Sequence, residues 1–139
     1  MPLWQSQLQN YAVTYNHSIG PMTITAVYPN TTTIGFSPPS PHKYFSYIEG
    51  ISIRATNPSG SGVTLTVRVV AIYEDYTEDE IVSIDVSEGE TFDDWLRWMY
   101  DAFSHKKKIK AVEVRCSCSD TPASGYEPSV AATLTGTVQ

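Results

Sequence analysis

The chain has 139 residues, a formal net charge of −6 and a sequence pI of about 4.9, and 41% of its residues are apolar. This length is that of one ordinary domain, which buries enough surface to fold without disulfides or a structural metal. The acidic balance excludes non-specific binding to nucleic acid, and no stretch approaches the roughly 18 continuous apolar residues of a membrane span.

The first part of the chain divides into an arm and the start of a domain. Residues 1–20 are polar and contain several glutamines, and we expect them to form an N-terminal arm before a single domain of residues 21–139. Met22–Tyr28 and Thr31–Phe36 alternate or carry β-branched residues, which predicts two strands. The Pro-Asn turn between them predicts that the two strands form a hairpin.

Three further strands are predicted in the middle of the chain. Lys43–Asn57 is typical of one long or two short strands, with a bulge or bend at Gly50. After an N-P-S-G-S-G turn, Val63–Glu74 contains the alternating run V-T-L-T-V-R-V-V and is the clearest strand. Ile81–Val86 follows a short acidic turn, and we expect it to form a hairpin with the preceding strand.

One helix is predicted, over about residues 92–105. Thr91 suits the N-cap position with Asp94 three residues later, and lysines follow the C-terminus, where positive charge is favourable. The apolar residues recur at the i, i+3, i+4 and i+7 spacing of one helical face: Phe92, Trp95, Leu96, Met99 and Phe103.

Two alternating strands, Ile109–Cys118 and Val130–Val138, end the chain. Cys116 and Cys118 share one strand face, a geometry that disfavours a disulfide, so two buried thiols are expected. Strands dominate and no series of strand, helix and parallel strand is present. The predicted fold class is therefore all-β: an antiparallel β-sandwich, either a jelly roll or another Greek key, with the helix in a connection.

The sequence carries no motif of a catalytic or cofactor site. It lacks G-x-S-x-G, G-x-x-x-x-G-K-[ST] and G-x-G-x-x-G, and His17, His42 and His105 stand apart from one another and from the cysteines. We expect a protein that is not an enzyme and binds no cofactor or metal. The acidic turn leaves calcium binding open, and an enzyme whose carboxylates converge only in the fold stays an alternative.

Two runs of opposite charge are candidates for an interface. The basic run comprises Lys106, Lys107, Lys108 and Lys110, and the acidic turn comprises Glu74, Asp75, Glu78, Asp79 and Glu80. Solubility, a solvated turn and the predicted helix end explain these runs without any partner. Alternatively, the lysines of one copy meet the acidic turn of the next copy, which gives head-to-tail association.

Aromatic residues suggest a second kind of surface. The candidate interface or ligand platform consists of Tyr44, Phe45, Tyr47, Trp98 and Tyr100. Rings in a flat exposed row stack on sugars or anchor a protein interface, whereas buried rings only fill the core. A carbohydrate-binding module with glycan partners is therefore the alternative to an assembly protein.

The acidic, Thr- and Ser-rich pattern of residues 20–138, with N-P-S-G-S-G and V-T-L-T-V-R-V-V, resembles small all-β virion structural proteins. The resemblance implies a capsid, spike or decoration subunit that forms a homo-oligomer or joins other structural proteins. It also implies that the arm of residues 1–20 reaches a neighbouring subunit. Because no signal peptide is visible, we expect cytoplasmic synthesis, with the virion as the final location if the resemblance holds.

Overall fold

The computed structural model describes residues 12–105 and 107–139 of the chain. Within those residues the fold consists of strands without a helix, which confirms the predicted all-β antiparallel class. The strands are β1 (Val13–Thr23), β2 (Thr32–Phe36), β3 (Phe45–Thr56), β4 (Leu65–Tyr73), β5 (Glu78–Val86), β6 (Thr91–Asp101), β7 (Ile109–Cys118) and β8 (Ser129–Val138). No helix that is long and apolar enough to cross a membrane occurs in the described ranges.

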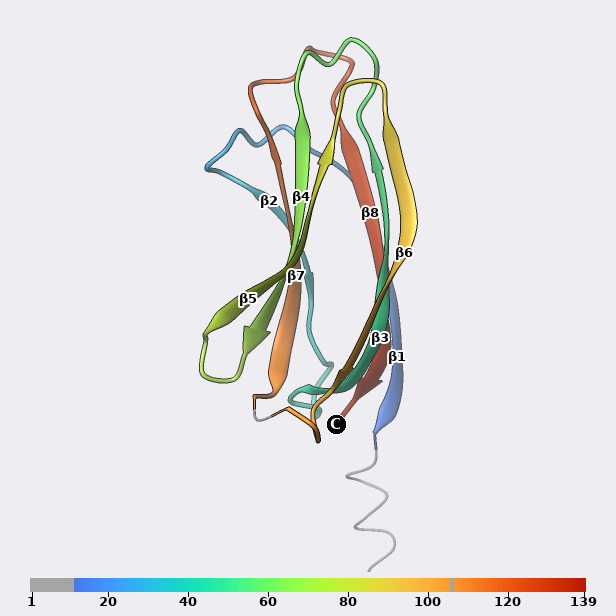
Figure 1. Ribbon diagram of the computed structural model, residues 1–139, viewed down its shortest axis with the longest axis vertical. Helices are drawn as coiled ribbons and strands as arrows, with labels where there is room; N and C mark the ends of the chain where they lie inside the picture. The colour runs from blue at the N-terminus through green and yellow to red at the C-terminus, as the bar shows by residue number, and fades with distance from the viewer. Residues whose placement is uncertain (1–11, 106) are drawn as a thin grey trace, which may run out of the picture.

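The strands form two facing layers, which are seen edge-on in Figure 1. One layer has the order β1-β8-β3-β6 and the other the order β2-β7-β4-β5, and the pairings within both layers are antiparallel. Among the described strands, one ladder contact, between Phe45 and Ile109, joins the two layers. The molecule is therefore a β-sandwich whose edge strands are β1 and β6 in one layer and β2 and β5 in the other.

The core lies between the layers and is built from alternating strand residues. β4 buries Leu65, Val67 and Val69, while Thr66 and Arg68 between them face outward. The inner faces of β7 and β8 contribute Val112, Val114, Cys116, Cys118, Val130, Ala132, Leu134 and Val138. These are the faces that the alternation predicted, because a strand with one dry face keeps its apolar residues two apart.

The first strand differs from the prediction. Residues 13–20, which were predicted to lie in a polar arm, form most of β1 and pair with β8. The rest of the predicted arm, residues 1–11, lies outside the described residues. β1 is an edge strand whose side chains are mostly exposed on both faces, and Tyr15 is its one buried residue. Hydrophobic alternation therefore does not reveal it.

The strand predicted over residues 22–28 and its hairpin are wrong. The regular strand ends at Thr23, and the chain then crosses from β8 to the other layer, where Val27 bridges Cys118. The predicted partner strand exists as β2, but β2 pairs with β7. The alternation in this segment has another cause, because Ile24 is buried between the layers while its neighbours are not.

The predicted helix over residues 92–105 is also wrong, because Thr91–Asp101 is strand β6 and pairs with β3. Between the pairs Ile48–Tyr100 and Gly50–Arg97, β6 has one residue more than β3, and Met99 in this bulge has a φ of 58°. A bulge breaks the strict alternation of side chains along a strand. The apolar residues of β6 therefore have a helix-like spacing although the segment is a strand. Aromatic residues favour strands, and the ladder to β3 outweighs the local helical tendency.

The N-P-S-G-S-G turn is anchored by its first residue. Asn57 is fully buried, and its Nδ2 donates to the carbonyl oxygens of Val63 and Val86 at 2.8 and 3.0 Å. Its Oδ1 accepts a hydrogen bond of 2.6 Å from the Ser61 hydroxyl. One amide side chain therefore ties the end of β3 to the approach to β4 and to the last residue of β5.

Candidate interaction surfaces

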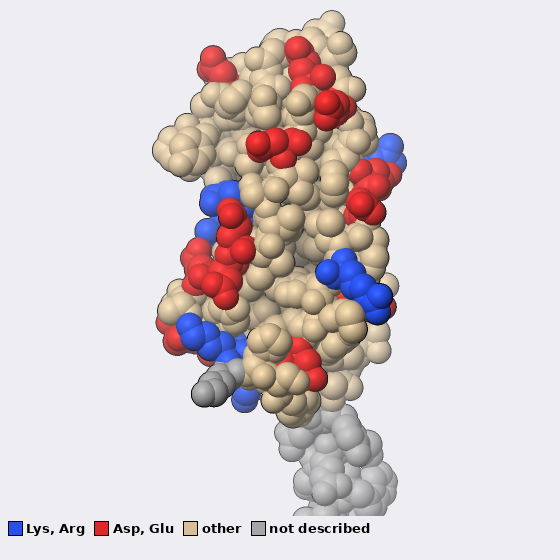
Figure 2. All heavy atoms as spheres, in the orientation of Figure 1, with Lys and Arg blue, Asp and Glu red and all other residues tan. Residues whose placement is uncertain are grey.

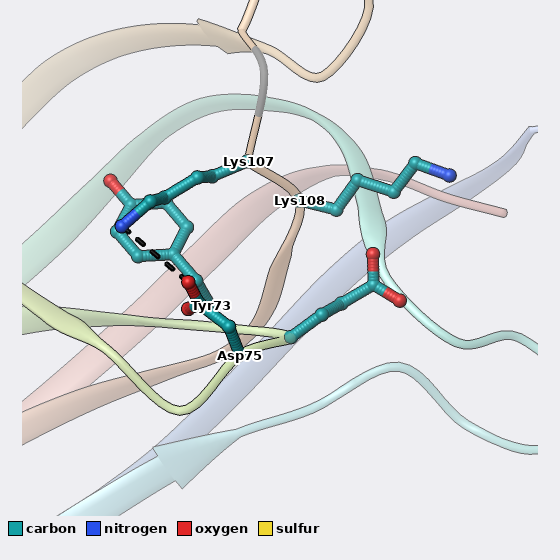
Figure 3. A pocket seen from close by; sticks show the side chains of 5 residues that line it. Tyr73, Asp75, Lys107 and Lys108 are labelled. Carbon is teal, nitrogen blue, oxygen red and sulfur yellow. Dashed lines mark ion pairs between the residues drawn. The ribbon is translucent and has the colours of Figure 1, made fainter.

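The basic run and the acidic turn meet within one chain (Figure 3). Lys107 Nζ lies 3.6 Å from a carboxylate oxygen of Asp75 and donates to the Thr77 hydroxyl at 2.9 Å. The same ammonium lies 5.3 Å from the centre of the Tyr73 ring. Because both charged groups are about half exposed, solvent screens the ion pair and it adds little to stability. Its structural effect is to fasten the turn after β4 to the segment before β7.

The neighbouring lysines contact aromatic rings of the same chain. Lys108 Nζ lies 4.4 Å from the centre of the Tyr44 ring, and Lys110 Nζ lies 3.6 Å from the centre of the Tyr76 ring. Both distances fall within the range of cation–π contacts. Lys106 lies outside the described residues. The three described lysines of the basic run are therefore engaged inside the chain that carries them, and head-to-tail pairing through them would require these contacts to break.

Three further carboxylates of the acidic turn, those of Glu78, Asp79 and Glu80, also have partners in the chain. Asp79 accepts a hydrogen bond of 2.7 Å from the Tyr73 hydroxyl, and burial together with this bond raises the pKa of Tyr73 to about 12. Glu78 forms an ion pair of 2.8 Å with Arg115, and Glu80 one of 3.5 Å with Arg68. No group of three His, Cys, Asp or Glu side chains suited to a metal ion occurs in the described residues.

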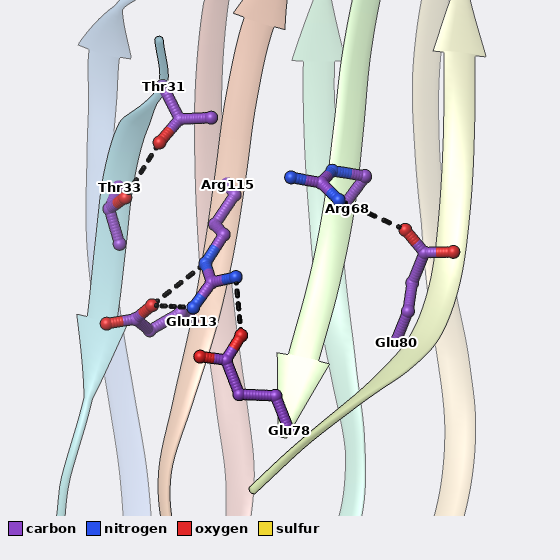
Figure 4. A network of polar contacts seen from close by, with 7 residues as sticks. All are labelled: Thr31, Thr33, Arg68, Glu78, Glu80, Glu113 and Arg115. Atoms are coloured by element: carbon purple, nitrogen blue, oxygen red, sulfur yellow. Dashed lines mark hydrogen bonds and ion pairs between the residues drawn. The ribbon is translucent and has the colours of Figure 1, made fainter. Parts of the chain in front are cut away.

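A charge network covers the outer face of the β2-β7-β4-β5 layer (Figure 4). Arg68 on β4 stands directly opposite Arg115 on β7, an arrangement in which like charges repel. Glu113 lies 2.8 Å from Arg115, next to the Glu78 and Glu80 contacts, so three carboxylates surround two guanidinium groups. The hydrogen bond from Arg115 also holds the pKa of the Glu78 carboxyl below its usual value. This network stabilises the outer face and leaves neither arginine as an open anion site.

The five residues of the predicted aromatic platform do not form an exposed row. Phe45 and Tyr100 are buried, and the Tyr100 hydroxyl donates to the Lys107 carbonyl at 2.7 Å. Tyr44, Tyr47 and Trp98 are partly buried, and Trp98 packs against the core. Two of the five rings are therefore inaccessible to any ligand, and the three partly buried rings do not form a flat exposed row with them.

Exposed apolar side chains gather along β6, where the sequence predicted the buried face of a helix. Trp95 is 42% exposed, Met99 52% and Phe103 80%, and Ile81 on the neighbouring β5 is also exposed. We call these four residues the β6 edge surface. In Figure 2 an uncharged area lies in the middle of the view, with charged side chains to its left and right and carboxylates above and below it.

An open groove of about 260 Å³ lies next to this surface, between the edges of the two layers. Its walls include Ile51, Val82, Leu96 and Trp98, together with two members of the β6 edge surface. On its other side β6 has no hydrogen-bonded neighbour strand among the described residues. An unpaired strand beside exposed apolar side chains is a typical site of contact with another chain.

A second hollow, of about 520 Å³, lies on the outer face of the other layer. Its lining combines the ring of Tyr28, which is 71% exposed, with the hydroxyl groups of Thr66, Ser117 and Ser119 and the side chain of Arg68. An aromatic wall and a floor of hydroxyl groups match the two faces of a sugar. Because Arg68 is neutralised by Glu80, the hollow carries no excess positive charge.

No protein-family model matches the chain, and no curated protein matches it. Among solved structures, it is similar to a chain of the infectious bursal disease virus Gx strain, at 13% identity and a TM-score of 0.48; the match covers 90% of this chain and 32% of that one. A chain of the T13 IBDV viral particle matches at 12% identity and a TM-score of 0.46, over 90% of this chain and 37% of that one. The VP2 subviral particle of the virus matches at 12% identity and a TM-score of 0.44, over 88% and 32%. This chain thus spans about a third of the length of the chains that it matches.

Proposed function

We propose that the chain is a non-enzymatic structural subunit that assembles with copies of itself, and that its sandwich is a jelly roll. The antiparallel pairs β1–β8, β2–β7, β3–β6 and β4–β5 are nested inside one another. Nested pairs of this kind arise when one long antiparallel ribbon is rolled up on itself. Eight strands rolled in this way give the two Greek keys of a jelly roll.

The observation that carries the proposal is the β6 edge surface. Isolated apolar residues are normal on a protein surface, but Trp95 and Met99 lie on one strand whose outer edge has no partner among the described strands, and Phe103 follows two residues after its end. Aromatic residues and Met are enriched where proteins bind one another. This location supports a contact that buries the strand edge together with its apolar side chains.

The other surfaces support the choice of assembly over chemistry. In the acidic turn, the carboxylates of Asp75, Glu78 and Glu80 form ion pairs within the chain. The carboxylate of Asp79 accepts a hydrogen bond, and Glu74 is the exception within the described residues. Groups that are already paired are poor candidates for a general acid or base. We extend the proposal to a virion capsid, spike or decoration subunit, which is the class that the Thr-rich acidic strand pattern resembles.

The experiment is the absolute mass of the protein in solution, measured by light scattering over a wide range of concentrations. We expect a closed oligomer that gives way to the 15.4 kDa monomer on dilution. Replacing Trp95 and Met99 by Ser should shift this equilibrium towards the monomer, whereas Tyr126→Ser, at an exposed ring in the β7–β8 loop, should not. A wild-type monomer at every concentration would overturn the proposal.

The hollow beside Tyr28 favours one second function, binding of a neutral sugar. The ring would stack on the apolar face of the sugar, and the hydroxyl groups of Thr66 and Ser117 would face its hydroxyl groups. A screen against immobilised glycans tests this function. Binding that Tyr28→Ala removes and Tyr126→Ala leaves intact supports it, and absence of binding to every glycan excludes it.

A further inference from the structure

The free edge of β6 is regular over its first seven residues. From Thr91 to Arg97, β6 pairs with β3 from Thr56 to Gly50 without a shift of register, and the bulge begins only after Arg97. The backbone N–H of Trp95 bonds to the carboxylate of Asp94 at 2.8 Å and not to β3. In an antiparallel ladder the direction of the backbone groups alternates, so Asp93, Trp95 and Arg97 present theirs to the open side.

The charges on this edge are arranged symmetrically about Trp95. Asp93 lies two residues before it and Arg97 two residues after it, so the three side chains share the outer face of the layer. Both charged residues are exposed, and neither forms an ion pair within the described residues, although Arg54 stands opposite Asp93 on β3. Because the acidic and the basic residue lie at equal distances from Trp95, the strand is complementary in charge to an antiparallel copy of itself.

We propose that β6 pairs antiparallel with β6 of a second copy, about a two-fold axis that passes through Trp95. Trp95 then opposes Trp95 of the second copy, and Asp93 of each copy opposes Arg97 of the other. The two β1-β8-β3-β6 layers become one continuous sheet across the axis. This inference rests on the proposed self-association and specifies its surface, its partner and its register.

The remaining contacts of the edge agree with this register. The regular part of the edge includes Asp93, Trp95 and Arg97 of each copy, and the bulge at Met99 begins only beyond the paired residues. The Asp94 carboxylate, which covers the Trp95 N–H in the single chain, must turn away before the strands pair. Charged side chains protect a free edge in this manner. We therefore expect an association that is reversible and dependent on concentration.

Exchange of the two charges tests the register. By symmetry, Arg97→Asp places two acidic pairs across the axis and Asp93→Arg places two basic pairs there, so each single variant should bind itself at least roughly tenfold more weakly. The double variant Asp93→Arg/Arg97→Asp restores both opposite pairs and should associate within about threefold of the wild type. Lys43→Asp, a charge reversal at an exposed residue outside β6, is the matched control and should have no effect.

A cross-link provides a second test that does not depend on charge. Paired residues of this kind have Cα atoms about 5.5 Å apart, which is within the range of a disulfide. Trp95→Cys should therefore form a covalent dimer on mild oxidation, whereas Thr91→Cys should not, because Thr91 lies four residues from the axis and its two copies do not meet. The natural cysteines are buried and do not compete.

The outcomes separate this inference from the function on which it rests. If the wild type associates but both single variants associate equally well, assembly stands and the β6 register is excluded. The register is equally excluded if the folded double variant stays dissociated, or if Thr91→Cys cross-links as readily as Trp95→Cys. If the wild type is a monomer at every concentration, both the inference and the assembly proposal fail.

Discussion

The indole ring of Trp95 lies directly against the backbone of Gly50 on the neighbouring strand. A Cβ atom built on Gly50 would come within 2.6 Å of Cζ2 of Trp95 and within 2.5 Å of the carbonyl oxygen of Leu96. Glycine is therefore required at this position for close approach. The contact places a large apolar ring on the outer face of β3 and β6, beside the edge that we propose as the dimer interface.

The first prediction follows from this contact. Gly50→Ala should lower the free energy of unfolding by about 1–3 kcal/mol, because the new methyl group displaces Trp95 and strains the β3–β6 ladder. Urea denaturation followed by tryptophan fluorescence measures both effects. Gly35→Ala is the matched control, since nothing lies within 4 Å of a Cβ atom at that residue, and it should change stability by less than about 0.5 kcal/mol. Equal effects of the two substitutions would contradict the contact.

Alternation predicted the central strands because the core imposes it. β4, β7 and β8 each bury one face and expose the other, so their apolar residues recur at every second position. The prediction for Ile109–Cys118 agrees with β7 at both ends. The bulge expected at Gly50 is confirmed in the pairing with β8, where β3 has one extra residue between the pairs Ile48–Gly136 and Gly50–Thr135.

Two of the edge strands, β1 and β6, escaped prediction for the opposite reason. β1 has little buried surface, so nothing in its sequence requires alternation. β6 contains a bulge at Met99, and its apolar residues are divided between an inner face, an outer face and the bulge. The resulting spacing coincides with that of a helix. This segment is a strand because it pairs with the free edge of β3. Since β3 lies 40 residues or so earlier in the chain, the local sequence of the segment does not reveal this pairing.

The candidate surfaces depend on contacts that the sequence does not display. The lysine run and the acidic turn are opposite in charge, but the prediction paired them between two copies, whereas Lys107 reaches Asp75 of its own chain. The fold places the segment before β7 beside the turn after β4, and pairing along the strands decides this proximity. Trp95, Met99 and Phe103 had been given to a buried helical face, so their exposure could not be predicted until the helix proved wrong.

The second prediction concerns the buried amide of Asn57. Asn57→Ala should lower the free energy of unfolding by about 2–4 kcal/mol, because the carbonyl oxygens of Val63 and Val86 lose their donor in a dry environment. Chemical denaturation measures the loss, and Asn30→Ala at an exposed turn is the control. Asn57→Asp should be at least as damaging at neutral pH, since it buries a charge and donates no hydrogen bond. Tolerance of both substitutions would show that this side chain does not hold the loop.

The third prediction concerns acid. The hydrogen bond from Arg115 lowers the pKa of Glu78 below its ordinary value of 4.5, and hydrogen bonds from Thr77 lower the pKa of Asp75 below 3.8. A lowered pKa in the folded state contributes stability that is present above the ordinary value and is lost as the pH falls through the lowered one. The urea midpoint should therefore fall below about pH 4.5, and Glu78→Gln should make this decline shallower. Glu49→Gln, at an exposed carboxylate of β3, should leave the slope as it is in the wild type.

The fourth prediction concerns the two thiols. Burial raises the pKa of Cys116 to about 12, with a smaller contribution from Cys118, whose own pKa is also raised by burial. Since the thiolate is the reactive species, neither thiol should react with Ellman's reagent at pH 8 in the folded protein, and both should react in urea. Rapid reaction of either thiol without denaturant would show that the β7 face opens.

The same shift makes the fold sensitive to alkali. A pKa raised in the folded state contributes stability that is complete below the ordinary value of 9.0 and is lost as the pH rises towards about 12. Cys116→Val keeps an apolar side chain of similar size, so it should preserve the urea midpoint at pH 7 and make the alkaline decline shallower. Part of the decline should remain, because burial also raises the pKa of Tyr73. An unchanged alkaline slope in the valine variant would mean that Cys116 does not govern this loss of stability.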